Sequence, residues 1–322
     1  FNIIEKKIRM CGIVAVTGYK KALPLLMNGL EKLEYRGYDS AGIAIINSET
    51  KNITCNKAEG KLKNLINNLN EKNMPGTVGI GHTRWATHGK PEIKNAHPHT
   101  DSSGTIAVVQ NGIIENFQDL KNKLQKEGVI FNSDTDTEVI PHLIQRELNT
   151  LSKLKLEKNG STLLVAVRNV ISDLEGSYAL AVLWADAPTA LVVARRQAPL
   201  IIGLGEGEFI CASDTPAIAN FTNIILPMED EEIALLTPLG IEIYDSNNER
   251  QYRSPVSLKV SEQIMDKMNF KHYMLKEIYD QPQTAKNWLK NYLIKNLDNG
   301  QYQIHYPFDT EFFESIERIE II

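Results

Sequence analysis

The stretch Met10-Cys11-Gly12-Ile13-Val14-Ala15-Val16-Thr17-Gly18 places a cysteine directly before a short apolar run that is bounded by glycines. A β-branched apolar run between glycines is typical of a buried strand. Cysteine is usually a small buried hydrophobic residue, and we interpret Cys55 and Cys211, which lie in strand-like segments, in this way. Cys11 differs from both because a methionine that could initiate translation precedes it.

Removal of Met10 would make Cys11 the first residue, with a thiol and a free α-amine on one carbon. The pKa of an α-amine is about 7.7–8.0, against ~10.4 for lysine, so roughly one sixth of such amines are neutral at pH 7. A neutral amine can accept the proton of the thiol, and no histidine is then needed. We therefore predict that Cys11 is a nucleophile and that its own α-amine is the general base.

Residues 1–10 read FNIIEKKIRM, which neither begins with Met nor contains the apolar segment of a secretory signal. We interpret these residues as a short leader or as translated upstream sequence. The functional chain is then expected to begin at Cys11.

The composition indicates an ordinary globular protein of about two domains, because the chain has 322 residues, 42% of them hydrophobic. The 35 basic and 40 acidic residues give a net charge of −5, which excludes a nucleic-acid binder that works by bulk charge. No apolar run approaches the ~20 residues that span a bilayer, so no membrane partner is expected. The 3 dispersed cysteines fit a reducing, cytoplasmic compartment.

The pattern of apolar residues predicts a layered α+β fold. Strands are expected at residues 12–18, 41–46, 77–82, 105–110, 178–184, 190–194, 200–204, 208–213, 223–226, 232–236 and 241–244. Helices are expected at residues 20–35, 62–69, 115–127, 136–148 and 162–174. Ser133 and Asp134 are predicted to cap the helix at 136–148. Most connections between strands are too short for a parallel crossover, so the sheets should be largely antiparallel.

The pattern becomes polar and irregular after residue 245, and we interpret residues 246–282 as a linker. A helix is expected to begin near residue 283. The apolar end Ile319-Glu320-Ile321-Ile322 resembles the first strand of a sheet. We therefore expect residues 11–245 to form one domain and residues 283–322 to begin a further domain that is cut short.

The segment His82-Thr83-Arg84-Trp85-Ala86-Thr87-His88-Gly89 follows a predicted strand and is dense in polar and planar groups, which favours a ligand-binding loop. The guanidinium of Arg84 could bind a carboxylate in a bidentate manner. The histidines of this segment and His97-Pro98-His99 suggest a metal site, but no cysteine or carboxylate stands at liganding spacing. We expect no metal and no cofactor.

Gln110-Asn111-Gly112 follows another predicted strand and admits two interpretations. Asn-Gly is a common turn dipeptide. Alternatively, the side-chain N–H of Asn111 and the main-chain N–H of Gly112 converge as an oxyanion hole.

Two further motifs resemble binding loops. Asp134-Thr135-Asp136-Thr137-Glu138 begins like a calcium loop, but Val139 replaces the required glycine. Asp134 is then a helix cap, whereas Asp136 could bind a substrate ammonium group. The glycine-rich segment at residues 203–207 lacks the third glycine of a phosphate loop and is interpreted as a hairpin turn.

The motifs, in their order along the chain, resemble those of the glutamine–fructose-6-phosphate aminotransferases (isomerizing). These motifs are residues 10–14, Glu34-Tyr35-Arg36-Gly37-Tyr38-Asp39-Ser40-Ala41-Gly42, residues 82–89, Asn95-Ala96-His97-Pro98-His99, residues 111–116 and residues 135–138. Residues 271–282 resemble the segment that joins the two halves of those enzymes. The resemblance covers the chain after Met10.

The resemblance implies an N-terminal-nucleophile fold, with two antiparallel sheets between helical layers, followed by a sugar isomerase domain. It implies that Cys11 attacks glutamine and that Asn111 and Gly112 form the oxyanion hole. Arg84 would hold the carboxylate of glutamine, and Asp136 its α-ammonium group.

The remaining roles also come from the resemblance alone. Thr87 and His88 would help to position glutamine, Trp85 would gate an ammonia channel, and Arg36 would lie beside the nucleophile. Glutamine is the expected partner of this chain, and fructose 6-phosphate would bind only through the part of the isomerase domain that the chain lacks. We expect a homo-oligomer for the full-length protein.

Two alternatives remain. One is another amidotransferase of the same class, such as the enzyme that aminates phosphoribosyl pyrophosphate. The other is a catalytically silent module, which would be favoured if the N-terminus were not processed to Cys11.

Overall fold

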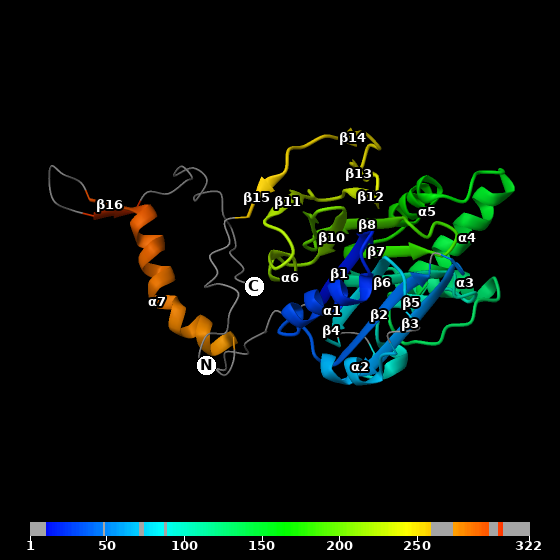
Figure 1. Ribbon diagram of the computed structural model, residues 1–322, viewed down its shortest axis with the longest axis horizontal. Coiled ribbons are helices and arrows are strands. Elements are labelled where there is room, and N and C mark those ends of the chain that lie inside the picture. Colours follow the sequence, from blue (N-terminus) through cyan, green and yellow to red (C-terminus); the bar gives the residue numbers. More distant parts are fainter. Residues whose placement is uncertain are drawn as a thin grey trace. The chain divides into compact units, whose positions relative to one another are not determined.

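The computed structural model describes residues 11–47, 49–70, 74–86, 89–258, 273–295 and 302–304 (Figure 1). The chain divides into two compact units, Arg9–Val260 and a second unit that combines Phe1–Ile8 with Ser261–Ile322. None of the helices in the described ranges is both long enough and apolar enough to cross a membrane.

Two antiparallel sheets form the centre of the larger unit. The first has the strand order β15 (Val256–Ser257), β11 (Ile224–Pro227), β9 (Ile201–Leu204), β10 (Glu208–Ala212), β1 (Gly12–Gly18), β4 (Val78–Arg84), β2 (Ser40–Asn47) and β3 (Asn52–Glu59). The second has the order β14 (Arg250–Gln251), β13 (Gly240–Tyr244), β12 (Ile233–Thr237), β8 (Leu191–Arg196), β7 (Gly176–Trp184), β6 (Ile106–Ile114) and β5 (His99–Thr100). The antiparallel arrangement expected from the short connections is confirmed.

Helices cover the outer face of each sheet (Figure 1). The first sheet packs against α1 (Ala22–Leu33), α2 (Leu62–Asn68) and α6 (Pro216–Ala219). The second packs against α3 (Phe117–Lys126), α4 (Val139–Lys153) and α5 (Gly160–Ser172). A third apolar cluster lies between the sheets, so the layers follow the predicted order helix, sheet, sheet, helix.

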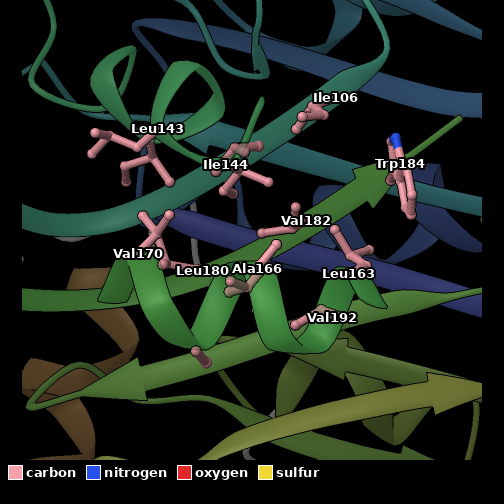
Figure 2. Packing of buried hydrophobic residues seen from close by; sticks show 14 of the residues in the cluster. Ile106, Leu143, Ile144, Leu163, Ala166, Val170, Leu180, Val182, Trp184 and Val192 are labelled. Carbon is pink, nitrogen blue, oxygen red and sulfur yellow. The ribbon is translucent and has the colours of Figure 1, made fainter. Parts of the chain in front are cut away.

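Strand β7 shows how alternation along a strand builds two of these layers. Its small residues Ala179 and Ala181 belong to the cluster between the sheets. The larger Leu180 and Val182 belong to the cluster that includes α4 and α5, and Figure 2 shows them beside Ala166 of α5. Small side chains on the inner face allow the two sheets to approach closely.

The start of α4 differs from the prediction. The helix begins at Val139, with Glu138 in the capping position, so Ser133 and Asp134 do not cap it. The carboxylate of Glu138 instead accepts hydrogen bonds from the main-chain N–H groups of Asn132 and Ser133, at 2.8 and 2.7 Å. The acidic segment is therefore folded back on itself before the helix starts, because the Glu138 carboxylate satisfies N–H groups that lie five and six residues earlier in the chain.

The hairpin turn predicted at residues 203–207 is confirmed. Strands β9 and β10 pair in an antiparallel manner, and the main-chain N–H of Gly205 donates to the carbonyl oxygen of Glu208 at 2.9 Å. Gly207 has a φ of +84°, a conformation that favours glycine.

The predicted linker contains regular structure in its described part. Strand β14 pairs with β13, and β15 pairs with β11, so both strands extend the sheets of the larger unit. In the other unit, α7 (Tyr273–Tyr292) begins ten residues before the predicted start near 283 and continues through Pro282, which sequence rules treat as a helix breaker. A hairpin of β16 (Leu293–Lys295) and β17 (Tyr302–Ile304) follows. The domain boundaries stay predictions, and residues 319–322 lie outside the described ranges.

Three buried histidines lie in contact with one another at the end of the sheets where Cys11 lies. The rings of His82 and His97 are stacked at 4.1 Å between centroids, and His99 meets His97 edge-on at 4.8 Å. Burial lowers the pKa of His82 to about 3 and lowers the pKa values of His97 and His99 well below the usual range. All three imidazoles are therefore neutral at physiological pH.

We expect the free energy of unfolding to fall steeply as the pH drops below about 6.5. Between that pH and the lowered native pKa values, the unfolded chain binds protons that the native histidines do not bind. Each histidine then contributes up to about 1.4 kcal/mol per pH unit. Urea unfolding at pH 7.5, 6.5, 5.5 and 4.5 measures the slope, and His99→Gln should have a shallower slope. Equal stability at pH 7.5 and 4.5 would contradict the assignment.

Candidate active site

Cys11 lies immediately before β1, in the middle of the first sheet between β10 and β4. Its carbonyl oxygen accepts hydrogen bonds from Arg36 Nε at 3.0 Å and from Asn111 Nδ2 at 3.1 Å. The next residue must be small, because a Cβ added at Gly12 would lie 2.5 Å from Thr83 Oγ1. The main chain on both sides of the thiol is therefore held in one position.

The thiol of Cys11 contacts the main chain of Trp85. The N–H of Trp85 donates to Sγ at 3.2 Å, and Sγ lies 3.5 Å from the Trp85 carbonyl oxygen. Burial raises the pKa of the thiol, although the Trp85 N–H and the charges of Arg84 and Arg36 act in the opposite direction. Among the described residues no side chain hydrogen-bonds to Sγ, so a nucleophilic role requires a proton acceptor from elsewhere.

A small pocket opens beside this thiol. Its lining residues are Cys11, Arg84, Trp85, His97, Gln110, Gly112, Thr135 and Asp136. Five of them were predicted as site residues, and they come from segments up to 125 positions apart in the chain. The structure therefore brings together a thiol, a cation and a carboxylate around one small space.

The two charged residues of the pocket are held by main-chain groups. Asp136 Oδ2 accepts a hydrogen bond from the N–H of Ile114 at 2.8 Å, which ties the carboxylate to the end of β6. The guanidinium of Arg84 donates to the carbonyl oxygens of Lys90 and Gly89, each at 3.3 Å. Both side chains are buried, at 5% and 3% exposure, so the pocket can bind a small zwitterion between fixed opposite charges.

Asn111 and Gly112 lie inside β6, where they pair with Ala179 and Tyr178 of β7, so the turn interpretation is wrong. Gly112 has a φ of +105°, and a Cβ there would lie 2.1 Å from the carbonyl oxygen of Ser177. Only glycine fits this position. Gly112 lines the pocket, and the Asn111 amide nitrogen lies against the Cys11 carbonyl, so both are beside the thiol.

Arg36 is held by a carboxylate that sequence reasoning missed. Its Nη1 lies 2.6 Å from Asp214 Oδ2, and the hydroxyl of Tyr35 donates to the same oxygen at 2.6 Å. The adjacent Ser213 accepts a hydrogen bond from the N–H of Ile13 at 3.0 Å. The only indication in the sequence was that Ser213 and Asp214 directly follow a predicted strand. Their position near Cys11 becomes evident only from the pairing of β10 with β1.

Trp85 lines the pocket and packs edge-on against Tyr38, with 4.9 Å between ring centroids. Thr87 and His88, which were also predicted to contact the substrate, lie outside the described residues. The main-chain N–H after Trp85, that of Ala86, donates to Asp39 Oδ2 at 2.8 Å. Asp39 thus fixes the loop that carries Trp85, a role that its motif alone did not reveal.

Three pocket residues were not predicted as site residues, namely His97, Gln110 and Thr135. The side-chain Oε1 of Gln110 accepts a hydrogen bond from Thr137 Oγ1 at 2.7 Å, whereas its buried Nε2 has no partner in the described part of the chain. The only indication in the sequence that Gln110 lies at the site was its position directly before Asn111. In the described ranges, no group of three histidine, cysteine or acidic residues is arranged to hold a metal ion.

Comparisons with known proteins agree with this arrangement. Residues 82–220 match the family model described as a glutamine amidotransferase domain. The chain is 49% identical over 320 residues to a glutamine–fructose-6-phosphate aminotransferase (isomerizing) of Thermosynechococcus vestitus and 48% identical over 313 residues to that of a Nostoc species. Each alignment covers 97% of this chain and 49% of the relative.

Solved structures support the same fold. The phosphoribosylpyrophosphate amidotransferase of B. subtilis matches with a TM-score of 0.61 and 28% identity, over 73% of this chain and 49% of that chain. This likeness and the two antiparallel sheets confirm the fold of the N-terminal-nucleophile amidotransferases.

The chain spans about half the length of the curated relatives that it matches. The order of motifs, the two-sheet fold and the identity to these relatives agree. The chain therefore carries a glutamine amidotransferase domain and is similar, over 97% of its own length, to about half of the length of the glutamine–fructose-6-phosphate aminotransferases.

Proposed function

We propose that this chain hydrolyses glutamine to glutamate and ammonia, with Cys11 as the nucleophile. The observation that carries the proposal is the pocket in which the thiol of Cys11 lies beside the oppositely charged Arg84 and Asp136. Glutamine is a zwitterion with an uncharged amide at its far end. A site for it needs one cation, one anion and a nucleophile at a distance from both charges.

Arg84 and Asp136 bind the charged end of glutamine in this proposal. The guanidinium pairs with the α-carboxylate in a fork geometry that suits two parallel hydrogen bonds. The carboxylate of Asp136 pairs with the α-ammonium group. Because both protein groups are buried and held by main-chain hydrogen bonds, they orient the side-chain amide of glutamine toward Cys11 without reorganising.

Cys11 carries out the chemistry together with its own α-amine, which is free only when the preceding residues have been removed. The amine accepts the thiol proton as sulfur bonds to the amide carbon, and the π electrons of the C=O bond move to oxygen. Collapse of the tetrahedral intermediate breaks the C–N bond, and the ammonium group returns its proton to the departing ammonia. Water then attacks the thioester, which releases glutamate and restores the thiol.

Asn111 and Gly112 stabilise the negative oxygen of this intermediate. The side-chain Nδ2 of Asn111 lies beside Cys11, and Gly112 lines the pocket. Fixed N–H donors of this kind act where charge develops in the transition state.

The remaining residues position the nucleophile and guide the product. Arg36 holds the carbonyl of Cys11 and is itself held by Asp214. Thr87 and His88 help to position glutamine, and Trp85 is the gate through which ammonia leaves.

In a protein of the relatives' full length, we propose that this ammonia converts fructose 6-phosphate into glucosamine 6-phosphate within a cytoplasmic homo-oligomer. The 49% identity to aminotransferases of that name favours this acceptor. Phosphoribosyl pyrophosphate is the second candidate, because the B. subtilis enzyme shares the fold at 28% identity. Chromatography of reactions that offer each acceptor to the full-length protein separates the two. An unprocessed chain would instead be a silent module.

The form of the chain that begins at Cys11 should hydrolyse glutamine, whereas the form that retains residues 1–10 should be inactive. In the longer form the nitrogen of Cys11 is an amide, which cannot accept the thiol proton at neutral pH. Intact mass identifies each form, and a coupled glutamate assay measures turnover. Equal turnover of the two forms would refute the role of the α-amine.

Cys11→Ala should abolish glutamine hydrolysis, because it removes the only thiol in the pocket lining. Cys55→Ala and Cys211→Ala are matched controls that should retain turnover, since they lie on β3 and β10 outside the pocket. Chemical denaturation shows whether each variant is folded. Loss of turnover in a folded Cys55→Ala or Cys211→Ala protein would mean that the nucleophile is misassigned.

Asn111→Ala should lower kcat by roughly 10²–10³ with little change in KM, because its donor acts mainly in the transition state. Arg84→Ala and Asp136→Ala should chiefly raise KM, since each binds a charged group that is remote from the reacting amide. Steady-state kinetics with glutamine separates the two patterns. A rise in KM alone for Asn111→Ala would place this residue in substrate binding.

A further inference from the structure

We propose that His82 is a positioning residue, which fixes the orientation of the Asn111 side-chain amide so that its N–H groups face the nucleophile. The proposal rests on the oxyanion role proposed for Asn111. His82 does not line the pocket, and in this proposal it acts through its hydrogen bond to Asn111.

The hydrogen-bond partners of His82 decide which of its ring nitrogens carries the proton. Nε2 lies 3.1 Å from the main-chain carbonyl oxygen of Gln110 and 3.1 Å from Asn111 Oδ1. A main-chain carbonyl can only accept a hydrogen bond, so Nε2 must be the donor. The other ring nitrogen, Nδ1, is buried without a partner in the described part of the chain.

This tautomer in turn decides the orientation of the Asn111 amide. With an N–H at Nε2, the atom of Asn111 that faces His82 must be the oxygen, because a flipped amide would bring two donors together. The Nδ2 atom then points to the other side, where it donates to the carbonyl oxygen of Cys11 at 3.1 Å. Its second N–H is left for the oxygen that becomes negative on the substrate.

The surroundings of His82 keep the ring in place. The side chain is fully buried, and its ring is stacked on His97. His97 Nδ1 accepts a hydrogen bond from the N–H of Gln110 at 3.2 Å, so the two histidines hold both main-chain polar groups of Gln110. Burial also lowers the pKa of His82 to about 3, so the ring is neutral across the working range of pH.

Two substitutions at position 82 test whether the site needs the imidazole ring of His82 itself or only its N–H donor. In His82→Gln the amide nitrogen is as many bonds from Cβ as Nε2 is, so the donor is retained. In His82→Asn the same amide is one bond shorter and cannot reach Asn111. His142→Asn is a matched control, because His142 is also a buried histidine and lies outside the pocket.

We expect His82→Asn to lower the kcat of glutamine hydrolysis about tenfold, the effect of one lost hydrogen bond, with KM unchanged. His82→Gln should recover most of this loss, and His142→Asn should leave kcat unchanged. In an Asn111→Ala background, His82→Asn should have no further effect, because the group through which it acts is absent. All kinetics use chains shown by mass to begin at Cys11.

A transition-state probe adds an independent readout. Glutamate 5-semialdehyde adds the Cys11 thiol across its carbonyl, which forms a C–S bond and places a hydroxyl in the oxyanion hole. His82→Asn should weaken the binding of this aldehyde by the same factor as kcat and leave the binding of glutamate unchanged. Nitrogen NMR of the native chain should show a protonated Nε2 and an unprotonated Nδ1 for His82, whether or not any variant folds.

The outcomes distinguish this inference from the proposed function. If Asn111→Ala does not lower kcat, the oxyanion role itself is wrong. If Asn111→Ala lowers kcat but His82→Asn does not, or if the two effects add, His82 does not act through Asn111. A protonated Nδ1 with an unprotonated Nε2 in the native chain would also overturn the proposal.

Discussion

The carbonyl oxygen of Cys11 is the point on which the site depends, because it accepts hydrogen bonds from two parts of the fold at once. Arg36 reaches it from the segment after α1, and Asn111 reaches it from β6 of the other sheet. Two donors on one carbonyl fix the main chain beside the thiol. They also require both sheets to be assembled before the Cys11 thiol has its surroundings.

Three of the buried polar side chains around this point are uncharged. The rings of His82, His97 and His99 are neutral, because burial lowers the pKa of each. Net charge in the pocket is confined to Arg84 and Asp136, which are both lining residues. A pocket with neutral walls and two fixed opposite charges distinguishes a zwitterionic amino acid from a simple anion or cation, because each end of the ligand must meet its own partner.

The sheets could be predicted well from the sequence, because their strands are short apolar runs between turns. The period of two along Ala179, Leu180, Ala181 and Val182 reflects burial on both faces, small residues toward the other sheet and large residues toward the helices. Prediction from residue type failed at two helix boundaries. Asp134 is a residue type that commonly caps helices, but Glu138 closes this loop instead, and α7 continues through Pro282.

The sequence by itself determined the chemistry that is available: a cysteine next to a methionine, an Asn-Gly pair after a strand, and an arginine and an aspartate in polar loops. These are properties of residue type and local spacing, which do not depend on the fold. Only the tertiary structure decided that the Asn-Gly pair continues a strand, that Asp214 holds Arg36, and that His82 faces Asn111. The physical reason is that each of these contacts joins segments that are far apart in the chain, and hydrogen bonds between segments 29 to 178 residues apart leave no local pattern in the sequence.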